Sequence, residues 1–374
     1  MQFIDLKAQY QKLKTDINHE IQNVLDSASF IMGKEVSEFE TMLSEFTSMK
    51  HSITCANGTD ALQMVFMAYE IGQGDAVFCP DITFIASVEP ACMLGATPVF
   101  CDIEMDTYNL CPKSLEEQIK NVISKGKHKP RAVVAVDFLG NPCKYDEITS
   151  ICKKYDLLLI EDSAQGFGSI YKNKKACTFG DISTTSFFPA KPLGCYGDGG
   201  AIFTNNDEIA DILTSIRVHG KGASKYENVR VGVNSRLDTI QAGILKVKLK
   251  AFENFEVDAR QNVAKRYDNA FKNHFVTPFV DENSQSIYAQ YALLAKNEEE
   301  RDKIIKHLTE NNIPNMVYYP YPQHVLEVYK GNIYNDIDFK NSIEYCKRTF
   351  SLPMHPYLEV EEQNLIINTV LEGF

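Results

Sequence analysis

The sequence predicts an α/β protein in which a large domain, with a mostly parallel sheet flanked by helices, precedes a smaller α+β C-terminal domain. Short apolar runs that suit buried strands alternate with segments of helical periodicity through the first half of the chain. Buried strands joined through helices are typical of a parallel sheet covered on both faces. The 374 residues exceed one ordinary domain, and the pattern changes near Asn234. We therefore expect domains at 1–233 and 234–374.

Two amphipathic helices are expected before the first strand, because apolar residues recur every three or four positions through residues 6–46. The expected strands of the large domain are short apolar runs at 52–55, 76–79, 98–101, 132–137, 157–160, 182–187 and 201–204. Helices are expected between strands, for example at 59–71 and 144–155. The smaller region is expected to hold helices at 236–250, 255–271 and 298–311, a strand at 287–295 and a loop at 318–322. No long linker separates the two regions, so the boundary is expected to be a packed hinge.

The composition is that of a globular protein, with 44% hydrophobic and 24% charged residues. A formal charge of −12 argues against nucleic acid or an anionic membrane as partner, because both require a broad basic surface. The ten cysteines form no C-x-x-C pair and have no zinc-ligand spacing, so we predict reduced core cysteines and no metal site. There is no signal-peptide pattern and no apolar run near the roughly 18 residues of a membrane span. These features predict a cytoplasmic protein.

Lys191 lies between a hydroxyl-rich strand end and a glycine-rich turn, and Asp162 lies 29 residues before it. A lone lysine in a glycine loop would be an ordinary surface residue. Here Asp162 closes a strand-like run, where open α/β sheets place their ligand-binding residues. Pyridoxal phosphate needs such a pair, because a lysine forms the Schiff base with its aldehyde and a buried carboxylate keeps its ring nitrogen protonated. The sequence therefore predicts a pyridoxal 5'-phosphate site with Lys191 and Asp162 as catalytic residues.

A second group of residues fits the cofactor phosphate. A strand ends at Cys55, Gly58 allows close backbone approach, and Thr59 opens a helix. The free amides of a first helical turn bind anions, although the same pattern is also an ordinary turn and N-cap. Together with Lys191 it predicts a phosphate site, to which Ser186 can add a hydroxyl.

A basic stretch runs from Arg217 to Arg236 in this acidic chain. It contains five basic residues and one acidic residue, namely Arg217, Lys221, Lys225, Arg230, Arg236 and Glu227. Most of these side chains are interpreted as solvated charges that aid solubility. Arg236 is the exception, because it follows Asn234 where polar residues open an amphipathic helix, and both are expected to face an anion site there.

Four segments together resemble the DegT family of nucleotide-sugar aminotransferases, which have the aspartate-aminotransferase fold (fold type I). They are ANGTDAL at 56–62, EDSAQ at 161–165, SFFPAKPLGCYGDGG at 186–200 and VGVNSRLD at 231–238. The resemblance runs from Phe3 to Pro356 and so covers essentially the whole chain. Within the family, the segment around Lys191 is most similar to the branch that aminates UDP-2-acetamido-3-keto-glucuronic acid, on the way to 2,3-diamino-uronic acids of bacterial surface polysaccharides.

The resemblance implies roles on the cofactor side of the site. Lys191 would carry the cofactor and act as general base for the 1,3-proton shift, Asp162 would pair with the ring nitrogen, and Gln165 would bond the ring oxygen. Phe84 would stack on the ring. The phosphate would be held by Gly58, Thr59, Asp60 and Ser186, together with Asn234 from a neighbouring subunit.

The resemblance also implies how substrates are held. Arg236 would bind a carboxylate in the neighbouring subunit's site, so that a homodimer builds both sites. Gly33, Tyr319 and His324 would lie on the nucleotide-sugar side. This chain has Tyr318-Tyr319-Pro320 where the branch it most resembles often carries a histidine before the Tyr-Pro pair, which is a departure from the family pattern.

The function predicted from these features is transfer of an amino group, with L-glutamate as donor, to a keto position of a UDP-linked sugar. One alternative is amination at C4 of another nucleotide 4-keto sugar. The other alternative is a cofactor-binding regulator that has lost catalysis. The intact Lys191 argues against the regulator, because family members that lose transamination replace this lysine.

Overall fold

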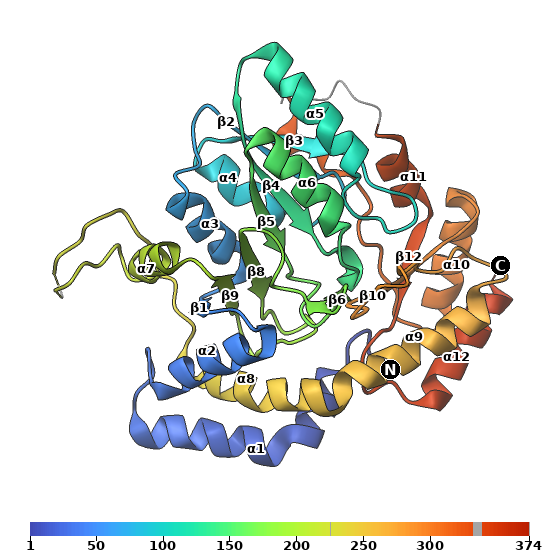
Figure 1. Ribbon diagram of the computed structural model, residues 1–374. Coiled ribbons are helices and arrows are strands. Elements are labelled where there is room, and N and C mark those ends of the chain that lie inside the picture. The colour runs from blue at the N-terminus through green and yellow to red at the C-terminus, as the bar shows by residue number, and fades with distance from the viewer. Residues whose placement is uncertain (225, 332–338, 374) are drawn as a thin grey trace.

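The computed structural model describes residues 1–224, 226–331 and 339–373. Its centre is a seven-stranded sheet in the order β1-β9-β8-β5-β4-β2-β3 (Figure 1). The strands of this sheet are β1 (His51–Cys55), β2 (Asp75–Pro80), β3 (Thr97–Cys101), β4 (Lys129–Val136), β5 (Leu158–Asp162), β8 (Ile182–Ser186) and β9 (Gly200–Thr204). β9 pairs antiparallel with β1 and β8, whereas the other pairs are parallel. The predicted mostly parallel sheet is confirmed, and each predicted strand of the large domain is present.

Helices cover both faces of this sheet, as the alternation of apolar runs predicted. The α-helices are α1 (Leu6–Ser27), α2 (Lys34–Thr47), α3 (Gly58–Ala68), α4 (Glu89–Met93), α5 (Pro112–Lys125), α6 (Tyr145–Tyr155), α7 (Asp207–Ile216), α8 (Thr239–Ala251), α9 (Val257–Phe271), α10 (Glu298–Glu310), α11 (Lys340–Arg348) and α12 (Val360–Glu372). α3, α4 and α7 form a buried apolar core with one face, and α5 and α6 form another with the opposite face. Both faces are therefore covered, which is why most of the strands are rich in apolar residues.

α8 links the two predicted regions. It packs beside α1 and α2 (Figure 1), and its buried residues Leu245 and Leu249 share a core with Phe39 of α2 and Phe203 of β9. The π-helical turn η3 (Phe252–Glu256) joins α8 to α9, whose buried face contributes to a separate C-terminal core. The boundary placed at 233/234 stays a prediction, and the structure places α8 against the sheet of the first region.

The C-terminal region is α+β. β11 (Tyr291–Leu294) and β12 (Thr349–Leu352) pair antiparallel, and α9, α10 and α12 pack with them. β11 is shorter than the strand predicted at 287–295, because Tyr288 has a left-handed φ of 48° that interrupts the extended chain. Ala292 and Leu294 also pack against Phe138, which follows β4. The two regions therefore meet at the carboxyl edge of the large sheet.

The remaining elements are short. They are the strands β6 (Ile170–Tyr171), β7 (Lys174–Lys175) and β10 (Ser284–Gln285), which form a small sheet, and the 3-10 turns η1 (Ile85–Ser87), η2 (Phe138–Gly140), η4 (Gln323–Val325) and η5 (Glu327–Tyr329). All ten cysteines are free and eight of them are buried. Within the described ranges, no helix combines the length and apolarity needed to cross a membrane.

Candidate active site

The phosphate cradle, which we define as residues 57–59 with Ser186, lies where β1 and β8 end. Asn57 caps α3 by accepting a hydrogen bond from the Asp60 amide to its Oδ1 (2.8 Å). The amides of Gly58 and Thr59 have no bonded partner among the described residues and point out of the first turn of α3. A Cβ built on Gly58 would lie 2.8 Å from the Cβ of Ser186. Only glycine therefore lets the helix start close on the serine, and the free amides and hydroxyl suit an anion.

Asp162 is the last residue of β5, the middle strand of the sheet. Its Oδ2 accepts a hydrogen bond from Ser87 Oγ (2.7 Å), and its Oδ1 accepts one from the Ala164 amide (3.1 Å). The preceding residue, Glu161, points to the other face of the strand and accepts bonds from the amides of Cys177 and Phe179. Of the two neighbouring acids, Asp162 is thus the one that faces the cavity described below.

Lys191 enters the same cavity from the loop after β8. The loop turns tightly, since the Lys191 amide donates to the carbonyl of Phe188 (2.8 Å). A Cβ on Gly194 would lie 2.5 Å from that carbonyl oxygen, so the turn requires glycine. Burial lowers the pKa of the Lys191 amine, and the negative charge of Asp162 opposes this shift. A buried amine with a lowered pKa carries less charge near neutral pH and can act as a base or nucleophile.

These groups line one cavity of about 460 Å³ between the carboxyl edge of the large sheet and the C-terminal region. Tyr319 reaches it from the C-terminal side and accepts a long hydrogen bond (3.4 Å) from Gln165 Nε2. Gln165 Oε1 accepts from the Leu139 amide (2.7 Å). Phe84 is 54% exposed and its ring lies 6.3 Å from that of Tyr319. The cavity thus has a phosphate cradle, an acid, an amine and aromatic walls.

A larger groove of about 1020 Å³ lies at the amino ends of the parallel strands. Its lining includes Arg131, Leu158 and Asp181, and it contains none of the predicted site residues. Ligands of open α/β sheets bind outside the carboxyl ends of the strands, so the smaller cavity is the candidate active site.

Three predicted residues lie together outside this cavity. The Gly33 amide donates to Thr239 Oγ1 (3.0 Å), and Ile31 forms an isolated bridge with Asp238. The loop before α2 therefore lies beside the segment that carries Asn234 and Arg236. Helix α8 begins at Thr239, three residues later than predicted, because burial alternates along residues 234–239 as in an extended strand. Asn234 and Arg236 thus precede the helix and do not form its first turn.

Two further predicted residues, His324 and Asp60, do not line the cavity. His324 was expected on the nucleotide-sugar side, but its Nδ1 bonds Asp81 Oδ2 (2.7 Å) and its ring stacks on Phe339 at 4.2 Å. Burial raises the pKa of Asp81, and the hydrogen bonds from His324 oppose this shift. Asp60 uses its amide to complete the Asn57 cap and does not line the cavity. Their predicted binding roles stay predictions.

Sequence reasoning missed two residues beside the site. Ser87, which bonds Asp162, lies 75 positions before it, and no local pattern marks it. Arg217 was grouped with the solvated charges of the basic stretch, but it is 5% exposed and forms an ion pair with Glu40. Lys225 of the same stretch lies outside the described residues. The only signal in the sequence was that Arg217 directly follows an amphipathic helix. This signal was too weak to predict its ion pair with Glu40.

The residues present fit pyridoxal phosphate. The cradle closes only around glycine and offers unpaired amides, and Asp162 and Lys191 face the same cavity. Together with the mostly parallel sheet, this arrangement defines a pyridoxal-phosphate enzyme of the aspartate-aminotransferase fold. The chain belongs to the DegT/DnrJ/EryC1/StrS aminotransferase family, whose model matches residues 11–371.

Similar proteins agree with this assignment. A "UDP-2-acetamido-2-deoxy-3-oxo-D-glucuronate aminotransferase" of Pseudomonas aeruginosa is 43% identical over 369 residues, covering 98% of each chain. The crystal structure of a DegT DnrJ EryC1 StrS aminotransferase from Brucella abortus has a TM-score of 0.97 at 43% identity and covers 100% of this chain and 99% of that one. The structure of ntda from Bacillus subtilis with bound cofactor PMP has a TM-score of 0.88 at 25% identity, covering 99% and 82%. Pyridoxal phosphate is therefore the cofactor, and the chain is a sugar aminotransferase.

Gly58→Ala is expected to weaken cofactor binding, because the added methyl group must push Ser186 or the start of α3 away from the phosphate. Overpacking of this kind costs about 1–3 kcal/mol, which corresponds to roughly five- to 150-fold in dissociation constant. Equilibrium dialysis of the apoenzyme measures the change. Gly243→Ala is the matched control, since its Cβ would meet Glu20 of α1 at an ordinary 3.5 Å. Equal cofactor affinity in both variants would contradict the assignment of the cradle.

Proposed function

We propose that this chain transfers the amino group of L-glutamate to the 3-keto position of UDP-2-acetamido-2-deoxy-3-keto-glucuronic acid, giving the 3-amino derivative for bacterial surface polysaccharide synthesis. The activity named for the similar Pseudomonas aeruginosa protein supports this substrate. The observation that carries the proposal is that Lys191 and Asp162 face one cavity with the phosphate cradle. The arrangement also speaks against a regulator without catalysis, since Lys191 is placed as the reaction requires.

Substrates that carry a carboxylate need a cation in addition to the one that lines the cavity. Glutamate and a uronic acid both carry a carboxylate. Among the described residues that line the cavity, Lys191 is the only basic side chain, and it is used in the chemistry. An arginine matches a carboxylate with two parallel donors. We therefore assign this role to Arg236, which one site would receive from a second subunit.

The direction of the segment 234–239 supports a homodimer with shared sites. Ser235, Leu237 and Thr239 are fully buried, whereas Asn234 and Asp238 are exposed and Arg236 is half-buried. In an extended chain alternate side chains point to opposite faces, so Asn234 and Arg236 point away from their own subunit. The neighbouring residues Phe30–Met32 are apolar and are 40–50% exposed. We propose that Asn234 reaches the cofactor phosphate of the partner and that Arg236 binds the substrate carboxylate there.

The chemistry divides among the residues of one site as follows. Pyridoxal phosphate, when bound, supplies an aldehyde that accepts the amino group and a ring that delocalises the charge of the reacting carbon. Asp162 would hold a proton on the ring nitrogen. The cradle would bind the phosphate and fix the position of the ring. Lys191 Nζ would take the proton from the carbon that bears the donor's amino group and return it in the 1,3-shift. The same amine would move the proton in the opposite direction when the keto sugar is aminated.

The substrate is tested by offering three UDP-keto-sugars with glutamate and following amination by mass spectrometry. The matched pair is the 3-keto-glucuronic acid and the corresponding 3-keto sugar with a neutral C6 hydroxymethyl group, and the third is a 4-keto-6-deoxy sugar. We expect the uronic acid to react fastest, and its advantage over the neutral sugar to shrink in Arg236→Ala. Faster amination of the 4-keto sugar would instead favour the C4 alternative, and no amination of any would contradict the proposed substrate.

The shared site is tested by subunit mixing. Arg236→Ala is expected to weaken carboxylate binding by roughly 1.5–3 kcal/mol, or about ten- to hundredfold. A heterodimer of one Lys191→Ala chain and one Arg236→Ala chain has one site with both lesions and one site with neither. Its activity should therefore return toward half of the wild-type value per dimer. Verified heterodimers without recovery would show that Arg236 does not act in the partner's site.

A further inference from the structure

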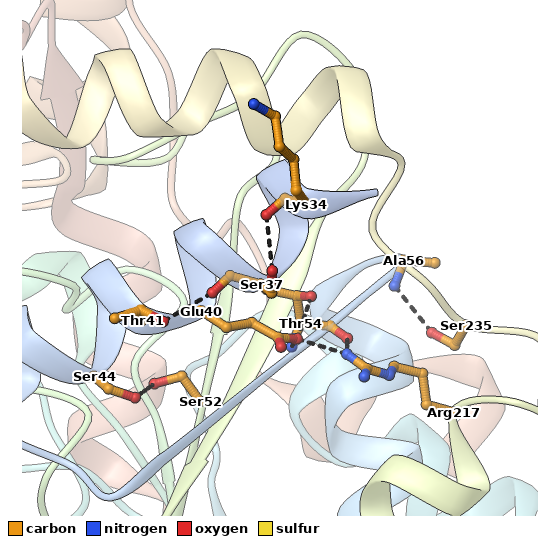
Figure 2. A network of polar contacts seen from close by, with 10 residues as sticks. All are labelled: Lys34, Ser37, Glu40, Thr41, Ser44, Ser52, Thr54, Ala56, Arg217 and Ser235. Atoms are coloured by element: carbon orange, nitrogen blue, oxygen red, sulfur yellow. Dashed lines mark hydrogen bonds and ion pairs between the residues drawn. The ribbon is translucent and has the colours of Figure 1, made fainter. Parts of the chain in front are cut away.

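A buried polar cluster joins α2, β1 and the base of the segment between α7 and α8 (Figure 2). We call this segment, described over residues 217–224 and 226–236, the arm. Arg217 begins it, and the Arg217 side chain is 6% exposed. Its Nη1 donates to Glu40 Oε1 of α2 (2.6 Å) and to the carbonyl oxygen of Thr54 in β1 (3.0 Å). One guanidinium thus contacts a helix and a strand that are far from it in sequence.

Glu40 completes the attachment to β1. The same Oε1 accepts hydrogen bonds from the amide (2.9 Å) and from Oγ1 (2.8 Å) of Thr54. Figure 2 shows these three groups converging on one carboxylate oxygen. The base of the arm is therefore fixed to Thr54 through both its carbonyl and its amide.

A second attachment lies two residues further along the chain, at Ala56 directly after the end of β1. The Ala56 amide donates to Ser235 Oγ (3.0 Å), and the Ser235 amide donates to the carbonyl of Arg217 (3.1 Å). Val218 and Asn234 form an antiparallel bridge, so the two ends of the arm are held together. Beyond Ala56 the chain continues directly into the phosphate cradle.

This arrangement has a geometric consequence for Asn234 and Arg236. They flank Ser235, whose side chain is fully buried on Ala56, so the inward anchor at Ser235 sets the outward direction of its two neighbours. We propose that Glu40, Arg217 and Ser235 are positioning residues, which fix the arm to β1 so that Asn234 and Arg236 reach the partner's active site in register. This proposal rests on the shared-site dimer proposed above.

The energetics of the ion pair favour positioning over general stabilisation. The Arg217 side chain is buried and the Glu40 side chain is 21% exposed. The desolvation energy of such a pair offsets much of its attraction, so the pair is a weak stabiliser compared with apolar packing. Arg217 Nε, moreover, is buried with no hydrogen-bond partner in the part of the chain that the structure describes. What the pair does supply is directional bonds between three segments. A positioned arm needs such bonds, because small misplacements of a substrate-binding group reduce turnover strongly.

The test uses heterodimers in which one chain carries Lys191→Ala, so that only the other chain's active site can turn over. We call that site and that chain the live site and the live chain. Glu40→Gln on the Lys191→Ala chain alters the arm that serves the live site, and kcat/KM for glutamate should fall roughly tenfold or more relative to the Lys191→Ala/wild-type heterodimer. Glu40→Gln on the live chain leaves that arm intact and should largely preserve kcat/KM. Ser235→Ala should likewise lower kcat/KM only when it is on the Lys191→Ala chain. It replaces Glu40→Gln in this test if the Glu40→Gln variant does not fold.

Ser52→Ala is the matched control. It removes a hydrogen bond between Ser44 and Ser52 (2.9 Å) that also joins α2 to β1 but does not touch the arm. It should leave kcat/KM unchanged on either chain. In homodimers, Glu40→Gln and Ser235→Ala should also raise the dissociation constant for the cofactor, measured by dialysis, whereas Ser52→Ala should not.

A loss that is equal on both chains, a loss that follows the live chain, or no loss would each overturn the positioning role. Failure of the dimer itself is distinguishable, because it would appear first as failed recovery in the Lys191→Ala/Arg236→Ala mixture. If activity returns in that mixture while Glu40→Gln lowers kcat/KM equally on either chain, the shared-site dimer stands and only the positioning inference fails.

Discussion

Lys191→Ala is expected to abolish turnover while the protein still folds and still binds the cofactor noncovalently. The phosphate cradle and Asp162 remain, and Lys191 makes no side-chain ion pair or hydrogen bond that the structure records among the described residues. The lost amine is the proposed base of the proton shift, and general-base catalysis alone contributes about 10²–10⁴-fold. Loss of the covalent attachment adds to this. Both half-reactions, measured with glutamate and with the keto sugar, should fail.

Borohydride reduction of the wild-type holoenzyme identifies the reacting amine by peptide mapping. The adduct is expected on Lys191 alone. Lys248 provides an internal comparison, because burial lowers the pKa of its amine to about 8, it is 1% exposed, and it lies over the ring of Tyr196 outside the cavity. If a lowered pKa were sufficient, Lys248 would be labelled too. An adduct on Lys248 or any other lysine, with Lys191 free, would show that the cavity is not the reaction site.

Much of this fold could be predicted from local patterns. Most strands of the large sheet are buried apolar runs, so they were visible without knowledge of their neighbours, although β8 is rich in serine and threonine. The residues of the candidate cofactor site could also be grouped from the sequence, because Asp162 ends a strand, Gly58 and Lys191 follow strands, and parallel strands bring their carboxyl ends to one edge. The topology of the sheet therefore brings residues from separate sequence motifs to one cavity.

Residues whose role depends on tertiary contacts were less accessible. Ser87 and Glu40 are ordinary hydrophilic residues in sequence, and only the fold brings them to Asp162 and Arg217. The late start of α8 has a similar origin. Polar residues before an amphipathic helix suggested a helix start at Arg236, but the buried anchors Ser235 and Leu237 keep the chain extended until Thr239. Local helix propensity cannot predict a helix start that is set by such tertiary contacts.

Asp162→Asn is expected to reduce turnover by about 10²–10³-fold, the scale measured when one preorganised polar group of an active site is removed. Asparagine keeps the volume of the side chain, and its oxygen can still accept from the Ala164 amide while Ser87 Oγ accepts from its nitrogen. The fold should therefore survive. What disappears is the negative charge that holds a proton on the ring nitrogen, and a charge-assisted hydrogen bond is stronger than a neutral one.

Ser87→Ala separates the charge of Asp162 from its hydrogen bonding. Ser87→Ala removes one hydrogen bond to Asp162 but keeps its charge, so it should cost about 1.5–3 kcal/mol in transition-state stabilisation, at or below the lower end of the loss of about 2.7–4 kcal/mol in Asp162→Asn. Turnover is compared at saturating cofactor, with the absorbance of bound cofactor recorded against pH as a readout of ring protonation. The pH at which the ring loses its proton should fall in Asp162→Asn and change little in Ser87→Ala. Turnover near the wild-type value in a folded, cofactor-loaded Asp162→Asn variant would mean that this carboxylate does not hold the ring proton.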